Sequence, residues 1–262
     1  MSLIAFVFGS LVGSFLNVCI LRIPAGRSIV FPGSHCPNCQ RPIRWFDNIP
    51  LLSFFVLRGR CRDCTVRISP QYFVVALATA LLCVFFYQRF GLNALGVIYL
   101  ALTLAILVES VIDWRHQIIP DQITLPGMVL GVAVSTLYPV LHGRHSALGG
   151  LLQSLVGLFV GGGFLYAAAV AAERLLKKEA MGGGDIKLLA MIGSLLGWKA
   201  VLWTIFVSSL LGTVVGVYRR IAKGEERIPY GPFLGAAAVL YIFFGKVVIH
   251  WYSNAIGWGE VF

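Results

Sequence analysis

Long apolar runs, separated by short polar connections, fill most of the chain. Most of the runs approach the roughly 20 residues that a helix needs to cross a bilayer. They are continuous, whereas a spanning strand would alternate polar and apolar positions. The eight runs lie near residues 3–21, 70–88, 92–112, 122–141, 148–172, 185–197, 199–218 and 231–250. The pattern predicts an all-α polytopic membrane protein with about eight transmembrane helices.

Two of these runs carry further expectations. The first holds Gly9 and Gly13 at a spacing that allows close helix contact, and Asn17, which should face protein rather than lipid. No basic residues precede this run, so we expect a transmembrane helix rather than a cleaved signal peptide. The run at 185–197 is short for a full span, so it is either tilted or ends inside the protein.

One long polar segment, residues 24–68, follows the first run. Its apolar stretch at 51–57 is too short to cross a membrane, so it lies at the interface or packs on the loop's own small core. We therefore expect three parts: a first transmembrane helix at 1–23, a cytoplasmic loop domain at 24–68, and a helical bundle at 69–262.

The composition agrees with a membrane location. Hydrophobic residues make up 58% of the chain and charged residues only 12%, against roughly 25% charged in soluble domains. The net charge of +10 would raise nucleic acid as a partner, but placing the 24–68 loop in the cytoplasm puts 17 of the 21 Lys and Arg residues on the inner side. This asymmetry is typical of membrane proteins. It predicts a multi-pass protein with its termini outside, whose partner is the lipid bilayer and not nucleic acid.

Four cysteines of the 24–68 loop form two Cys-x-x-Cys pairs, Cys36 with Cys39 and Cys61 with Cys64. Four thiolates in such pairs suit tetrahedral zinc, and a site closed by four protein ligands is structural rather than catalytic. The alternatives are two disulfides or a redox pair, and a reducing cytoplasmic location argues against disulfides. We expect zinc, which would help to fold a loop whose own core is small.

Asp113 closes an apolar run, and Glu109 lies one helical turn before it on the same face. Ionisable groups inside a membrane are costly and are functional candidates by default. The plainer alternatives are an ion pair of Asp113 with Arg115 and a structural role for Glu109. Asp121, which follows Pro120, can be explained as a helix cap.

Asp185 opens an apolar run directly after Gly182, Gly183 and Gly184. A plain helix cap would also place an aspartate there, but three glycines let an extended peptide backbone approach the carboxylate. The charge count puts Asp113 and Asp185 at the same face of the membrane. Two aspartates that share a site can share a proton, which leaves one acid and one base for peptide hydrolysis. We predict that these two aspartates are catalytic and that the three glycines bind substrate.

Several motifs occur together and in order along the chain. Gly182-Gly183-Gly184-Asp185 fits the Gly-x-Gly-Asp motif of intramembrane aspartic proteases. The other motifs are Gly13-Ser14-Phe15-Leu16-Asn17-Val18, the two Cys-x-x-Cys pairs, Ile112-Asp113, Ile119-Pro120-Asp121 with Leu125-Pro126, Asp185-Ile186-Lys187-Leu188 and Ile228-Pro229-Tyr230-Gly231-Pro232-Phe233. Across nearly its whole length, the chain resembles the type IV prepilin peptidases.

The resemblance implies a bacterial inner-membrane enzyme of type IV pilus or type II secretion systems. Such enzymes cut the leader from prepilins and pseudopilins at the cytoplasmic face, and many also methylate the new N-terminal residue with S-adenosylmethionine. The resemblance implies Asp113 and Asp185 as the catalytic pair. It implies, as zinc ligands, Cys36, Cys39, Cys61 and Cys64.

One stretch departs from the family pattern, which usually reads Tyr-Pro-x-Val-Glu after the zinc loop. Here it reads Tyr72-Phe73-Val74-Val75-Ala76, with alanine in place of the glutamate. The stretch has been linked to the methylation half of the family's activity. We therefore expect the peptidase activity and treat the methyltransferase activity as a second candidate, and the residues of a cofactor pocket stay unassigned.

Two other functions use the same features. A presenilin-like protease would cut within transmembrane helices with the same pair of aspartates, but it has no need of a zinc loop. A non-enzymatic zinc-bearing scaffold or transporter subunit would use its intramembrane acids to carry protons or ions.

Overall fold

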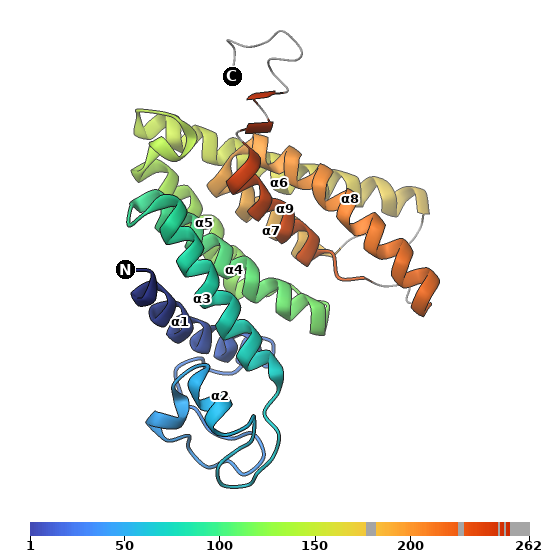
Figure 1. The fold of residues 1–262 in the computed structure, drawn as a ribbon. Coiled ribbons are helices and arrows are strands. Elements are labelled where there is room, and N and C mark those ends of the chain that lie inside the picture. The colour runs from blue at the N-terminus through green and yellow to red at the C-terminus, as the bar shows by residue number, and fades with distance from the viewer. Residues whose placement is uncertain (177–181, 225–227, 246, 249, 252–262) are drawn as a thin grey trace. The chain divides into compact units, whose positions relative to one another are not determined.

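The computed structural model describes residues 1–176, 182–224, 228–245, 247–248 and 250–251, and within these ranges the chain is helical with no strand (Figure 1). Two isolated β-bridges lie in the loop after the first helix. The α-helices are α1 Ser2–Arg22, α2 Leu52–Val56, α3 Pro70–Phe90, α4 Ala94–His116, α5 Asp121–Leu137, α6 Ala147–Leu176, α7 Gly183–Leu196, α8 Trp198–Lys223 and α9 Gly231–Leu240. The shorter elements are the 3-10 helices η1 Trp45–Asn48 and η2 Pro139–His142 and the π-helical turn η3 Tyr241–Gly245.

The predicted all-α membrane fold is confirmed, because each predicted apolar run overlaps a helix in the described residues. In the described part of the chain, five helices are long and apolar enough to cross a membrane, namely α1, α3, α4, α6 and α8. The helix α5 and the segment Gly231–Gly245 are apolar but shorter. The count of eight spans therefore stays a prediction.

The chain forms two compact units, Met1–Leu104 and Ala105–Phe262, and the boundary falls inside α4. We describe each unit by itself. The division into 1–23, 24–68 and 69–262 concerns membrane topology and remains a prediction. The same holds for the side assignment of the basic residues, four of which, Lys177, Lys178, Arg227 and Lys246, lie outside the described residues.

The first unit is built on the pairing of α1 with α3. A Cβ added at Gly9 would lie 2.8 Å from the Cα of Ala80, and one at Gly13 would lie 2.7 Å from the Cα of Ala76. Only glycine lets the two backbones approach this closely, as the spacing of the pair predicted. Asn17 is 2% exposed and donates through Nδ2 to the carbonyl of Tyr72 on α3 at 3.0 Å, so it faces protein as expected.

In the second unit, four other helices surround the short helix α7. Helices α5, α6, α8 and α9 all contact α7, and every residue from Leu188 to Leu195 is buried. The packing is close because Gly127 and Gly131 of α5 lie directly against Met191 and Ser194 of α7. Of the two explanations for its short length, burial of α7 inside the protein is the one that the structure supports.

Candidate active site and cysteine cluster

Asp113 lies in the last turn of α4 and meets the first residue of α9. The Gly231 backbone N–H donates to Asp113 Oδ2 at 3.0 Å, and the carboxyl side chain is 5% exposed. A Cβ at Gly231 would lie 2.8 Å from Asp113 Oδ2, so a larger residue would push the two apart. The start of a helix carries a partial positive charge that favours a nearby carboxylate. Sequence reasoning included Gly231 in a motif but gave it no role.

Asp185 is the third residue of α7, and the helix cap is Gly182, which has no side chain to bond the backbone. The plain-cap explanation of Asp185 is therefore wrong. Its carboxyl group is half-buried in the first turn, where the helix dipole also favours negative charge.

The two aspartates belong to the same corner of the second unit. Ile119, in the connection from α4 to α5, links them: a Cβ at Gly184 would lie 2.8 Å from Ile119 Cβ, and a Cβ at Gly231 would lie 3.1 Å from Ile119 Cδ1. The carboxyl groups of Asp113 and Asp185 interact electrostatically. We call Asp113, Asp185 and the residues that join them, Ile119, Gly184 and Gly231, the acidic corner.

Glu109 lies one turn before Asp113 on α4 and is 1% exposed. Neither of its carboxyl oxygens has a hydrogen-bond partner. Burial of a carboxyl group without a hydrogen-bond partner is costly. Asp113 makes no ion pair with Arg115 in the described part of the chain, where Arg115 is exposed. The ion-pair explanation of Asp113 is therefore not supported.

Asp121 connects α5 to α7 rather than capping a helix. It is the first residue of α5, after the cap Pro120. Its two carboxylate oxygens accept from Lys187 Nζ at 2.7 and 2.8 Å. Lys187 follows Asp185 by two residues along α7. Sequence reasoning missed it, since only the packing of α5 on α7 brings these two residues together.

The three glycines before and within α7 differ in their surroundings. Gly184 lies against Ile119, whereas a Cβ at Gly183 would meet nothing within 4 Å and one at Gly182 only Asp185 Oδ2 at 3.6 Å. Gly182 and Gly183 are exposed. The backbone beside Asp185 is therefore open, and the substrate-binding role of Gly182, Gly183 and Gly184 stays a prediction.

Each Cys-x-x-Cys pair of the first unit closes with the same backbone hydrogen bonds. Cys36 N–H donates to the Arg41 carbonyl, and Gln40 N–H donates back to the Cys36 carbonyl, at 3.0 and 2.9 Å. The second pair repeats the arrangement, from Cys61 to Val66 and from Thr65 to Cys61. Gln40 and Thr65 both have positive φ, 58° and 55°. Two equivalent turns therefore present the four thiols.

The four thiols converge on one point. The sulfur atoms of Cys36, Cys39, Cys61 and Cys64 all lie within 4.8 Å of one another, and Cys36 Sγ and Cys64 Sγ are 3.7 Å apart. Tetrahedral bonds of about 2.3 Å to zinc would place two sulfurs about 3.8 Å apart. The cluster thus fits a metal ion, and the sulfurs are not joined as disulfides.

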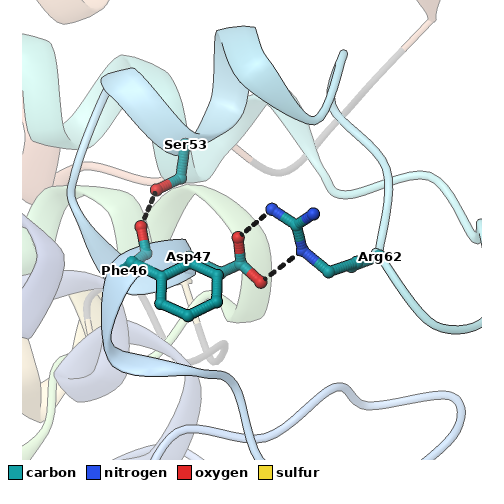
Figure 2. Close-up of polar contacts among 4 residues, drawn as sticks. All are labelled: Phe46, Asp47, Ser53 and Arg62. Carbon is teal, nitrogen blue, oxygen red and sulfur yellow. Dashed lines mark hydrogen bonds and ion pairs between the residues drawn. The ribbon is translucent and has the colours of Figure 1, made fainter.

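An ion pair ties the second turn to the rest of the loop (Figure 2). Arg62 donates through Nε and a terminal nitrogen to both oxygens of Asp47, at 2.8 and 2.6 Å. Ser53 Oγ donates to the Phe46 carbonyl at 3.1 Å, which fixes η1 against α2. The hydrogen bond from Arg62 holds the pKa of the Asp47 carboxyl below its usual range.

Comparison with known proteins identifies two matching family models. The Bacterial Peptidase A24 N-terminal domain matches residues 7–90, and the Type IV leader peptidase family matches residues 98–217. The first match covers residues 24–68, which we call the cysteine loop, and the second covers both Asp113 and Asp185. No solved structure matches the chain.

Curated relatives extend the match over most of the length. The prepilin leader peptidase/N-methyltransferase of Stutzerimonas stutzeri is 35% identical over 272 residues, which cover 94% of this chain and 91% of that protein. The protein of the same name from Pseudomonas aeruginosa is 34% identical, covering 96% and 93%. That of Myxococcus xanthus is 39% identical over 84% of this chain, and the aligned part spans 63% of its length. The chain belongs to the type IV leader peptidase family.

Proposed function

We propose that the protein is a membrane-embedded aspartic endopeptidase that removes the leader peptide of type IV prepilins or pseudopilins. The observation that carries the proposal is the acidic corner, in which Ile119 links the surroundings of Asp113 and Asp185, and the open backbone of Gly182 and Gly183 lies beside Asp185. The family of the chain and the names of its relatives support the same reaction.

The corner contains the groups that peptide hydrolysis requires. One aspartate, ionised, takes a proton from a water molecule, and the resulting hydroxide attacks the scissile carbonyl carbon. The other aspartate, protonated, gives its proton to the leaving amine nitrogen, so the pair is regenerated with its proton exchanged. Because Asp113 Oδ2 is held by the Gly231 N–H, Asp113 Oδ1 is the oxygen that remains for the water or the substrate.

The substrate reaches the corner along the exposed glycines. An extended peptide needs a surface without side chains if its backbone is to come within reach of a carboxylate. Gly182 and Gly183 provide such a surface directly before Asp185, and Gly184 is held by Ile119. The apolar helix of the prepilin then remains in the bilayer while its leader lies at the cytoplasmic face. The charge asymmetry of the sequence supports a cytoplasmic position for the acidic corner and for the cysteine loop.

Zinc is the metal that suits the cysteine cluster. Four sulfur ligands close a tetrahedral site, which leaves no position for water or substrate, so its role is structural. The metal would hold the two turns of the loop, whose short helix α2 and few buried residues form only a small core.

N-methylation of the new N-terminus is the second candidate activity of the protein. The relatives' names include this activity, and S-adenosylmethionine would be the methyl donor. Ala76, however, stands where the family usually has a glutamate; it is 2% exposed, and a Cβ added at Gly13 of α1 would lie 2.7 Å from its Cα.

One assay separates the candidate functions. Purified protein is incubated with a full-length prepilin in lipid, and the products are weighed by mass spectrometry. Loss of the leader alone shows the peptidase, and an added methyl group shows the second activity. A cut within the apolar helix would favour the presenilin-like alternative, and an unchanged substrate would favour the non-enzymatic one.

A further inference from the structure

Three arginines line a cavity of about 540 Å³ at the start of α3. Arg58, Arg60 and Arg67 form its charged part, and Phe54, Ile68 and Pro70 form an apolar part. All of these residues belong to the first unit, whereas the residues of the acidic corner belong to the second. Nothing in the proposed peptidase reaction uses it.

Two of the arginines lie directly opposite each other. Arg60 and Arg67 form an isolated antiparallel β-bridge. The residues on either side of this pair make the backbone hydrogen bonds: Cys61 N–H donates to the Val66 carbonyl at 2.9 Å, and Ile68 N–H donates to the Gly59 carbonyl at 2.8 Å. It is therefore the kind of pair in which opposing side chains come closest. Like charges in that position destabilise the bridge, so an anion between the two guanidinium groups would stabilise it.

The loop itself supplies no such anion. Residues 24–68 contain two acids, and both pair with other arginines. Asp47 binds Arg62 at 2.6 Å (Figure 2), and Asp63 lies 3.4 Å from Arg41. The cavity therefore gathers three positive charges that neither carboxylate of the loop neutralises.

The position of the cavity points to a lipid. It opens where α3 begins, and α1 and α3, which flank the loop, are both long and apolar enough to span a membrane. Phe54 packs on Phe73 in the first turn of α3, with ring centroids 5.2 Å apart, while Phe55 beside it is exposed. A cationic wall and an apolar wall at a membrane surface match a molecule with a phosphate group and acyl chains.

We propose that this cavity binds the phosphate-bearing headgroup of an anionic phospholipid. The guanidinium groups of Arg58, Arg60 and Arg67 bind the phosphate, since arginine forms paired hydrogen bonds to its oxygens. The acyl chains leave along Phe54 and Pro70 toward the bilayer. The lipid thus screens the repulsion between Arg60 and Arg67 and attaches the cysteine loop to the membrane surface.

The test uses the full-length protein, purified with its metal in a neutral detergent. Dioctanoyl phosphatidylglycerol, dioctanoyl phosphatidylcholine and inorganic phosphate are added separately, and the retained molecules are counted by native mass spectrometry. The variant Arg60→Gln/Arg67→Gln removes the opposing pair. Arg27→Gln/Arg44→Gln is the matched control, because it removes two charges from the same loop outside the cavity.

We expect the unmodified protein to retain phosphatidylglycerol about tenfold better than phosphatidylcholine. Arg60→Gln/Arg67→Gln should lower this retention about tenfold, and the control should change it less than about twofold. Equal losses in both variants would overturn the proposal, since attraction to the loop's overall charge would then suffice. If inorganic phosphate binds as tightly as phosphatidylglycerol, the lipid proposal is wrong, and the ligand of the cavity is a free anion.

Zinc content, measured on every sample, reports whether the loop is folded. If Arg60→Gln/Arg67→Gln loses its metal, Arg58→Gln gives the test, because this residue lies on a turn outside the bridge. Retention of phosphatidylglycerol that is unchanged in Arg58→Gln with normal zinc content would contradict the proposal.

Discussion

The cysteine loop takes all its ligands from one short stretch, Cys36 to Cys64, whereas the acidic corner draws on α4, α7 and α9. Two local turns present the four thiols, and each turn closes on itself by backbone hydrogen bonds. The corner has no such local frame. The Gly231 N–H of α9 holds the carboxylate of Asp113, and Gly184, the residue before Asp185, packs on Ile119. The geometry of the metal site therefore depends on the four cysteines and their local turns, whereas the geometry of the acidic corner depends on how the helices pack.

This difference predicts which substitutions each region tolerates. In the cysteine loop, only removal of a ligand should matter greatly, because the backbone turns form independently of the helices. In the acidic corner, a single added methyl group at a helix contact should matter nearly as much as a change of the charged groups.

Among these substitutions, Cys36→Ser should have the largest effect, which is the loss of bound zinc. Loss of one of four thiolates opens the site, so bound zinc should fall from about one per chain to near zero. Atomic emission measured on the purified protein checks this. Cys83→Ser is the matched control, since Cys83 is buried in α3 and outside the cluster. Unchanged zinc in Cys36→Ser would show that the cluster does not hold the metal.

Gly231→Ala should lower kcat about 100-fold with little change in KM. The new Cβ would lie 2.8 Å from Asp113 Oδ2, and a displacement of about 1 Å at a reacting group costs on that order. Steady-state cleavage of prepilin measures the effect. Gly163→Ala is the control, because a Cβ at that helical position meets nothing within 4 Å. Equal activity in both variants would show that Gly231 does not position Asp113 for the reaction.

Glu109→Met should stabilise the protein. The substitution removes a buried carboxyl group without a hydrogen-bond partner, whose desolvation costs about 1–3 kcal/mol, and replaces it with an apolar side chain of similar length. Thermal unfolding of the purified protein in lipid measures the change. A marked loss of stability would mean that Glu109 binds a partner after all.

The smallest effect belongs to the ion pair of Asp121 with Lys187. Both side chains are substantially exposed, and exposed pairs of this kind contribute about 0.2–1 kcal/mol. A double-mutant cycle with Asp121→Asn and Lys187→Met, followed by thermal unfolding, should give a coupling energy in that range. A coupling well above about 1 kcal/mol would show that the pair fixes α5 on α7.

The sequence predicted the parts of the molecule that depend on local pattern. Apolar run length gave the helices, and the Cys-x-x-Cys spacing gave the cluster. Gly9 and Gly13 indicated the contact of α1 with α3, because small residues one turn apart form one face of a single helix. The position of Asn17 could be predicted for the same reason, since a polar side chain avoids lipid.

The parts that depend on tertiary contact could not be predicted. Asp185 and Asp121 each looked like a helix cap, but the caps are Gly182 and Pro120, and the two acids lie inside their helices. The hydrogen bond from Gly231 to Asp113 joins residues 118 positions apart. The partner of Lys187 likewise depends on how α5 packs on α7, and no local pattern contains that information.

The central claim is that Asp113 and Asp185 together carry out peptide hydrolysis. Single-turnover cleavage of prepilin by Asp113→Asn and by Asp185→Asn tests it most directly, with Asp121→Asn as an acid of the same region outside the pair. We predict that each of the first two variants loses at least about 1,000-fold in rate, while zinc content and protein yield stay normal and Asp121→Asn remains within about threefold of the unmodified protein. Normal cleavage by either Asp113→Asn or Asp185→Asn would contradict the account.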